Sequence, residues 1–130
     1  MSYEVTLIRG SFEPTAREKL KYQDFSGIEK IDTLFEGHDA EGVTVCGIRD
    51  YLLYAVHNDN TVNENTDYSQ LVLITNTGDT YVTGSATFIR DFETIFSVIR
   101  SEETEPFDIK IRKMASRRYS GKYFLKVSVV

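Results

Sequence analysis

One amphipathic segment places the firmest constraint on what this chain can fold into. Between residues 86 and 100 the apolar side chains recur every three or four positions, as on one face of an α-helix: Phe88, Ile89, Phe92, Ile95, Phe96 and Ile99. Ser85 precedes the segment and is a suitable N-cap, because its hydroxyl can accept a hydrogen bond from a free amide of the first turn. Such a stripe must be buried for the helix to persist, so we expect these phenylalanines in the core.

The segments on both sides of this helix have the pattern of β-strands. Residues 43–57 are rich in β-branched and aromatic side chains, and Gly47 interrupts them where a bulge or bend is expected. They predict one long bent strand or two short ones, with Cys46 as a small hydrophobic core residue. Four further stretches have strand character: 70–75, 80–83, 107–113 and 122–130.

The resulting order is three strands, one helix and a two-stranded hairpin. This is the order of the OB-fold, a small Greek-key barrel that recurrently binds oligonucleotides. We therefore expect a mainly β fold, in which residues 43–130 form an OB-like five-stranded barrel with one helix between strands three and four. In such a barrel the loops at 57–69 and 114–121 would flank the binding face.

Residues 1–42 fall outside this scheme. Residues 3–9 predict an additional strand, and residues 13–22 predict either a short helix or an extended charged segment. A length of 130 residues is typical of one domain. We therefore expect the first 42 residues to be an elaboration packed on the barrel within a single domain.

The charges are distributed very unevenly along the chain. The net charge is −5, but residues 106–130 hold seven of the 15 basic residues and only one of the 20 acidic residues, Asp108. The local balance is therefore +6 there and −11 over residues 1–105. A basic face on an acidic protein suits a selective binder of polyanions, since it attracts phosphate while the remaining surface resists indiscriminate association.

Strand alternation divides the C-terminal hairpin into two faces. One face is expected in the core, and it holds Phe107, Ile109, Ile111, Tyr123, Leu125, Val127 and Val129. The other face presents Lys110, Arg112, Lys122, Phe124 and Lys126. Cations that lie opposite one another repel unless an anion lies over them, and an exposed ring can stack on an unpaired base. This face therefore predicts a site for single-stranded nucleic acid.

Further residues are expected at the same site. The hairpin tip adds two guanidinium groups and a ring, from Arg117, Arg118 and Tyr119. Three tyrosines of the preceding strands could extend the stacking surface: Tyr51, Tyr54 and Tyr81. A regular strand would expose only one of Tyr51 and Tyr54, because their positions have opposite parity, and core or edge packing is the alternative for each tyrosine.

Several other classes of function find little support in the residues. The sequence has one cysteine, two histidines and none of the usual nucleotide-binding, nucleophile or metal-site motifs, so we expect no enzyme, metal or cofactor. No run of about 18 apolar residues occurs, so we expect a cytoplasmic protein without a membrane partner. Two alternatives stay open for the hairpin: a solvated edge whose lysines prevent aggregation, and a structural or protein-interaction module of a phage or mobile element.

Residues 43–130 also resemble the small single-stranded DNA-binding proteins of tailed bacteriophages, particularly those of protein-primed replication. Four segments carry the resemblance: Gly78–Val82, the Ser85-led helix ending near Ile99, Phe107–Ile111 and Gly121–Val127. It implies sequence-independent coating of displaced DNA strands in the host cytoplasm, with the hairpin residues Lys110, Arg112, Lys122, Phe124 and Lys126 as contacts. The resemblance leaves open RNA as a ligand and the oligomeric state. The terminal Ser128-Val129-Val130 lacks the acidic tail of bacterial housekeeping relatives, so recruitment of repair partners through a tail is not expected.

Overall fold

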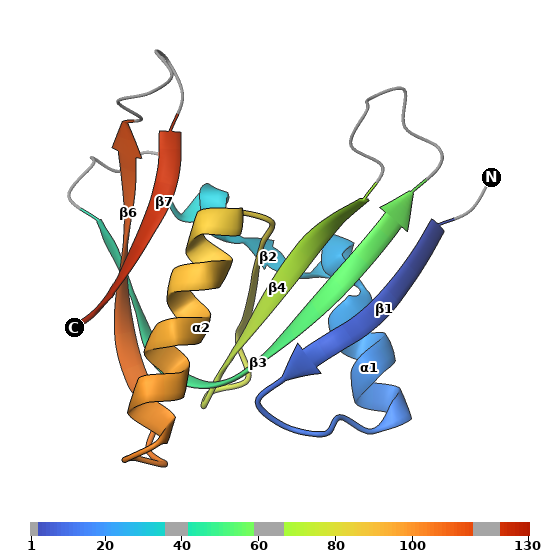
Figure 1. Ribbon diagram of the computed structural model, residues 1–130, viewed down its shortest axis with the longest axis horizontal. Coiled ribbons are helices and arrows are strands. Elements are labelled where there is room, and N and C mark those ends of the chain that lie inside the picture. The colour runs from blue at the N-terminus through green and yellow to red at the C-terminus, as the bar shows by residue number, and fades with distance from the viewer. Residues whose placement is uncertain (1–2, 36–41, 59–66, 116–122) are drawn as a thin grey trace.

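The computed structural model describes residues 3–35, 42–58, 67–115 and 123–130. Seven strands form one sheet: β1 (Tyr3–Gly10), β2 (Glu29–Lys30), β3 (Val43–Asn58), β4 (Asp67–Thr75), β5 (Thr80–Thr83), β6 (Phe107–Ala115) and β7 (Tyr123–Val129). Helix α1 (Ala16–Gln23) lies behind the sheet and helix α2 (Ala86–Arg100) lies in front of it (Figure 1). Two short 3-10 turns, η1 (Phe25–Gly27) and η2 (Ile31–Phe35), lead from α1 toward β3.

The long strand β3 organises the sheet. The strand order is β2-β5-β4-β3-β6-β7, and β1 pairs with β3 outside this path. β4 lies along one edge of β3 from Ile48 to His57, whereas the other edge is shared by β6, near its start, and β1, near its end. All of these pairs are antiparallel, and only the two-residue strand β2 runs parallel to its neighbour β5. The sheet therefore curls into a half-barrel (Figure 1).

The bend of β3 at Gly47 allows one strand to serve both halves of the sheet. Gly47 has φ +72°, a backbone angle that residues with a side chain rarely adopt. A Cβ there would also collide with the side chain of Asn76. The Gly47 amide donates to Asp108 Oδ1 (2.8 Å), and the Gly47 carbonyl accepts from the Asn76 amide (2.8 Å). The bend is thereby held by β6 on one side and by the turn after β4 on the other.

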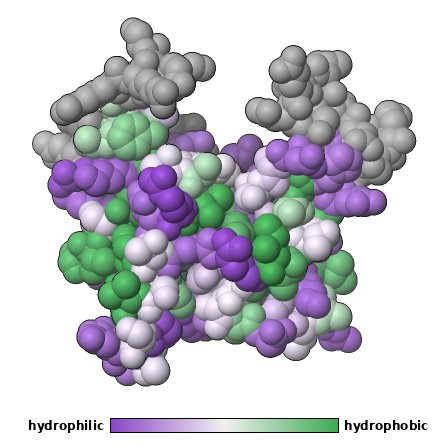
Figure 2. Space-filling view, in the orientation of Figure 1, coloured by the Kyte–Doolittle hydropathy of each residue, from purple (hydrophilic) through white to green (hydrophobic). Residues whose placement is uncertain are grey.

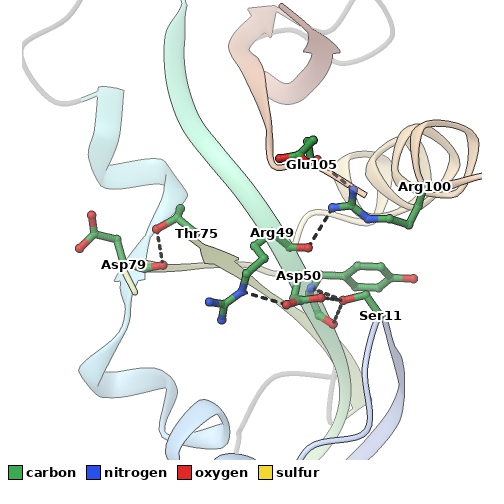
Figure 3. Close-up of polar contacts among 8 residues, drawn as sticks. Ser11, Arg49, Asp50, Thr75, Asp79, Arg100 and Glu105 are labelled. Atoms are coloured by element: carbon green, nitrogen blue, oxygen red, sulfur yellow. Dashed lines mark hydrogen bonds and ion pairs between the residues drawn. The ribbon is translucent and has the colours of Figure 1, made fainter. Parts of the chain in front are cut away.

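Polar side chains fix the chain just after the bend (Figure 3). Asp50 accepts hydrogen bonds from the Ser11 hydroxyl (2.9 Å) and from Arg49 Nε (3.0 Å). The Arg100 guanidinium, at the end of α2, donates to the carbonyl oxygens of Arg49 (3.1 Å) and Glu105 (2.9 Å). These bonds join the loop after β1, the bend of β3 and the end of α2.

Two clusters of apolar side chains lie on opposite sides of the sheet. On the α2 side, α2 packs its phenylalanines onto buried residues of β3, β4, β6 and β7. On the α1 side, Tyr22 and Ile28 cover residues of β3, β4 and β5, namely Leu52, Tyr54, Val72, Ile74 and Val82. The fold is therefore a curled sheet with a helix on each side.

The predicted elements are largely confirmed. The helix spans Ala86–Arg100, and the Ser85 hydroxyl accepts from the Phe88 amide (3.3 Å) as its N-cap. The residues from 43 onward form one long bent strand, and residues 13–22 contain a helix, whose Thr15 and Glu18 make a capping box. Neither α1 nor α2 is long and apolar enough to cross a membrane.

Two expectations need correction. The described residues form a seven-stranded half-barrel with two helices, and a five-stranded barrel with one helix is not confirmed, because β1 and β2 of the N-terminal segment join the same sheet. Cys46 is exposed and is not a core residue. Its neighbour Val45 takes the buried position, and strand alternation then turns the thiol outward.

Candidate functional site

The hairpin of β6 and β7, here called the ribbon, has one buried face and one open face. Its buried face packs on α2 through Phe107, Ile109, Ile111, Leu125 and Val127, which are at most 9% exposed. Three cross-strand pairs occupy the face turned away from α2, here called the outer face: Lys110 with Ser128, Arg112 with Lys126, and Met114 with Phe124. The alternation predicted from the sequence therefore brings Lys110, Arg112, Phe124 and Lys126 onto one surface.

The cations of the outer face lack acidic partners among the described residues. Arg112 and Lys126 are exposed and directly opposite one another, and Lys110 is half-buried. No ion pair within residues 3–35, 42–58, 67–115 and 123–130 involves any of the three. The nearby carboxylate of Asp108 accepts the Gly47 amide instead. The outer face is therefore a positively charged surface that no described carboxylate neutralises.

Gly42 brings the start of β3 close to these cations. It has φ +104°, and a Cβ at this position would lie 2.8 Å from Lys110 Cε and 3.2 Å from Arg112 Cγ. Glycine therefore lets the backbone lie against the aliphatic parts of both side chains. This contact limits the directions that the two charged groups can take.

Exposed apolar groups continue the outer face toward the far end of the ribbon. Phe124 and Met114, which lie opposite one another, are each 37% exposed. Phe124 precedes Lys126 by two residues on the same face, so its ring lies next to the Arg112 and Lys126 pair. The surface thus combines an aromatic face with adjacent cations, the two components that single-stranded nucleic acids require.

Two residues that were expected in the core are exposed. Tyr123 is 62% exposed and Val129 is 50% exposed. The ribbon extends past the start of α2 (Figure 1), so the helix does not cover Tyr123, and Val129 is the last residue of an edge strand. Lys113 Nζ lies 5.2 Å from the centre of the Tyr123 ring, within the range of a cation–π contact.

The tyrosines of the preceding strands do not extend the outer face. Tyr54 is 1% exposed and packs in the α1-side cluster, where its ring meets that of Phe25 (5.5 Å between centres) and its hydroxyl donates to the Lys19 carbonyl (3.3 Å). Burial raises the pKa of Tyr54 to about 12. The prediction that Tyr54 adds to a stacking surface is therefore wrong. Its side chain points to the side of β3 that α1 covers.

Tyr51 and Tyr81 are half-buried on the α2 side of the sheet. The Tyr51 ring packs edge-on against Phe96 (5.0 Å between centres), and burial, followed by the charge of Glu93, raises the pKa of Tyr51 to about 12. Burial also raises the pKa of Tyr81. These two tyrosines point away from the outer face of the ribbon, so the expected common surface does not form.

A separate ionic contact connects α2 to β1. The Arg9 guanidinium donates two hydrogen bonds to the Glu93 carboxylate (both 2.6 Å), and the Tyr51 hydroxyl donates a third (3.1 Å). The bond from Arg9 is the main reason that the pKa of Glu93 is lowered. The hydrogen bonds of Arg9, Tyr51 and Glu93 are made to one another, so this contact serves to hold α2 on the sheet.

The remaining predicted contacts lie outside the described residues: Arg117, Arg118, Tyr119 and Lys122. Sequence reasoning missed three described residues at the far end of the ribbon, namely Lys113, Met114 and Tyr123. Met114 continues the alternation that identified Lys110 and Arg112, so the strand pattern could have included it. Tyr123 and Lys113 carry no such signal, because their exposure depends on where α2 begins.

Searches with protein-family models, among curated proteins and among solved structures found no match for this chain.

Proposed function

We propose that this protein binds single-stranded DNA on the outer face of the ribbon, largely without regard to sequence, and coats unpaired strands during replication. The observation that carries the proposal is the pair of Arg112 and Lys126, which lie opposite one another next to the exposed ring of Phe124. Two cations in this position destabilise the sheet unless an anion lies between them. Phosphate groups supply that anion, and the ring stacks on an unpaired base.

The order of the strands supports the same proposal. The order β5-β4-β3-β6-β7, with α2 between β5 and β6, is the one expected for an open OB-type barrel. The usual ligand face of that fold includes the second and third strands, which are β4 and β5 here. In this chain, residues of the α1-side cluster cover that surface. We therefore place the ligand on the ribbon, where the outer face is open.

A salt titration tests this function. Binding of oligo-dT, followed by tyrosine fluorescence, should weaken with salt at a log–log slope of about −3, for about four phosphates at about −0.7 each. A duplex of the same length should bind more weakly, since its bases offer no free faces. Salt-independent binding, or equal affinity for the duplex, would contradict the proposal.

A charge variant locates the site. Replacement of Lys110, Arg112, Lys122 and Lys126 by Gln should leave the protein folded and greatly reduce the salt slope. The matched control replaces four cations of the N-terminal segment, Arg17, Lys19, Lys21 and Lys30, by Gln. This control removes the same net charge but leaves the ribbon unchanged, so it should retain most of the salt slope. Equal losses in the two variants would show attraction by net charge alone, without a site.

The uneven charge favours one alternative function, a protein-interaction module in which the acidic residues 1–105 meet a basic partner. In that case the ribbon only completes the sheet, and the variant with four Gln replacements would still bind the basic partner. Oligo-rU in place of oligo-dT decides between DNA and RNA as the ligand.

A further inference from the structure

A hollow lies beside the end of the ribbon, between β7 and the start of α2. It encloses about 460 Å³ and is open to solvent. Its lining includes Lys113, Tyr123, Phe124 and Leu125 of the ribbon, together with Asp32 and Thr87. We propose that this hollow receives one unpaired base of the bound strand, stacked on Tyr123 and hydrogen-bonded to Asp32. The inference rests on the proposed function and specifies which base the site prefers.

The end of the ribbon carries an exposed aromatic ring on each face. Phe124 lies on the outer face and is 37% exposed, whereas Tyr123 faces the α2 side and is 62% exposed. Consecutive residues of a strand point to opposite sides. A single ligand can reach both rings by passing around the edge of β7. The strand β7 is at the end of the sheet path, so no described strand lies along that edge.

Single-stranded DNA can follow such a path because its backbone is flexible and its bases are unpaired. One base stacks on Phe124 between the cations of the outer face, and a neighbouring base enters the hollow beside Tyr123. Lys113 lies over one face of the Tyr123 ring at 5.2 Å, so the base would stack on the other face. A duplex cannot bind in this way, since its bases are paired on both strands.

Asp32 gives the hollow a hydrogen-bond acceptor that suits a base, while Lys113 of the same lining lies over the Tyr123 ring. The Asp32 side chain is exposed, and it takes part in no ion pair among the residues described by the structure. A carboxylate repels phosphate but accepts a hydrogen bond from an exocyclic amino group, as in the pairing of Asp with cytosine N4. Thymine presents the carbonyl O4 at the same place, so the hollow should favour cytosine over thymine.

Affinities for oligo-dC and oligo-dT of equal length test the inference. The wild-type protein should bind oligo-dC about fivefold more tightly, which corresponds to about 1 kcal/mol, the lower end for a specific contact to a base. Asp32→Asn should abolish this preference, because an amide offers a donor as well as an acceptor. Glu102→Gln is the matched control, since Glu102 is exposed on the loop after α2 and its loss changes the charge equally. It should keep the preference.

Variants at Tyr123 test the stacking partner. Tyr123→Leu should weaken oligo-dC binding at least fivefold, because the stacking ring is lost. The salt slope should not change, because no contact to phosphate is removed. Tyr123→Phe should restore the affinity. Photocrosslinking of an oligonucleotide that contains 5-iododeoxycytidine, with mapping by mass spectrometry, should label Tyr123 as well as Phe124.

The outcomes separate this inference from the proposed function. Salt-dependent binding with equal affinity for oligo-dC and oligo-dT, or a preference that Asp32→Asn leaves intact, overturns the base-binding hollow alone. The same holds if crosslinks form at Phe124 and not at Tyr123. Failure of the wild-type protein to bind any single strand overturns both.

Discussion

The side of the sheet that faces away from α2 has two regions of opposite character. Over β3, β4 and β5 it carries Leu52, Tyr54, Val72, Ile74 and Val82, all at most 2% exposed beneath α1 and the chain that follows it. Over β6 and β7 it carries the cations and the exposed Phe124 of the outer face, and neither described helix lies across them. The two regions belong to one continuous sheet, so the difference between them lies in their side chains.

This comparison shows how one sheet can serve both stability and binding. Apolar residues on the first region need a cover, and the N-terminal segment supplies it. Charged residues on the second region are already well solvated, so they gain nothing from such a cover. In the view that shows the α2 side, hydrophilic and hydrophobic side chains are interspersed over the described residues (Figure 2). The α1 side differs, because its apolar and its cationic residues are segregated.

The largest expected effect separates the two regions by their contribution to stability. Ile74 is 0% exposed in the covered region, so Ile74→Ala should lower the free energy of unfolding by about 2–5 kcal/mol through lost burial and a cavity. Lys126→Ala on the outer face should change it by about 0.5 kcal/mol or less. Urea denaturation measures both. Similar losses in the two variants would show that the ribbon surface is structural.

The next effect concerns binding. Phe124→Ala should reduce the affinity for oligo-dT by about 1–3 kcal/mol, because one base loses its stacking partner. Val98, an apolar residue of α2 that is 65% exposed, provides the control, and Val98→Ala should leave the affinity unchanged. An unaltered affinity in Phe124→Ala would remove the ring from the site.

Alkaline pH should act on the covered region. The pKa of Tyr54 is raised to about 12, whereas an unfolded tyrosine ionises near pH 10. The unfolded state therefore loses its proton first, and the free energy of unfolding should fall as the pH rises from about 10 to 12. Tyr54→Phe should be less stable at neutral pH, since the hydrogen bond to Lys19 is lost, and should show a shallower fall. An equally steep fall in the variant would be evidence against burial as the cause.

The smallest effect lies outside both regions, at the contact of Arg9 with Glu93. Glu93→Gln should cost about 0.2–1 kcal/mol at neutral pH, because Arg9 is more than half exposed and solvent screens the pair. The pKa of Glu93 is lowered in the folded state, so this stabilisation is present above pH 4.5 and is lost as the pH falls through the folded-state pKa. Wild type and variant should then converge in acid unfolding. DNA affinity should not change, and a loss there would place α2 in the ligand site.

Local patterns in the sequence predicted most of the elements and part of the site. The spacing of apolar residues and the Ser85 cap defined α2, and period-two alternation placed Lys110, Arg112, Phe124 and Lys126 on one face. Both depend on residues close together in the chain, whose geometry is fixed by helix and strand periodicity. The alternation gave the correct side for Tyr123 but not its exposure, and the hydrophobic character of Cys46 misled about its burial, because burial depends on what packs against the strand.

The sequence by itself determined which residues share a face of each helix or strand, because that relation follows from backbone geometry alone. Only the tertiary structure decided which of those faces are covered. α1 covers the β3–β5 region and buries Tyr54, whereas α2 begins too low on the ribbon to cover Tyr123. Coverage is the result of contacts between segments far apart in the chain, and the packing of the whole molecule sets those contacts.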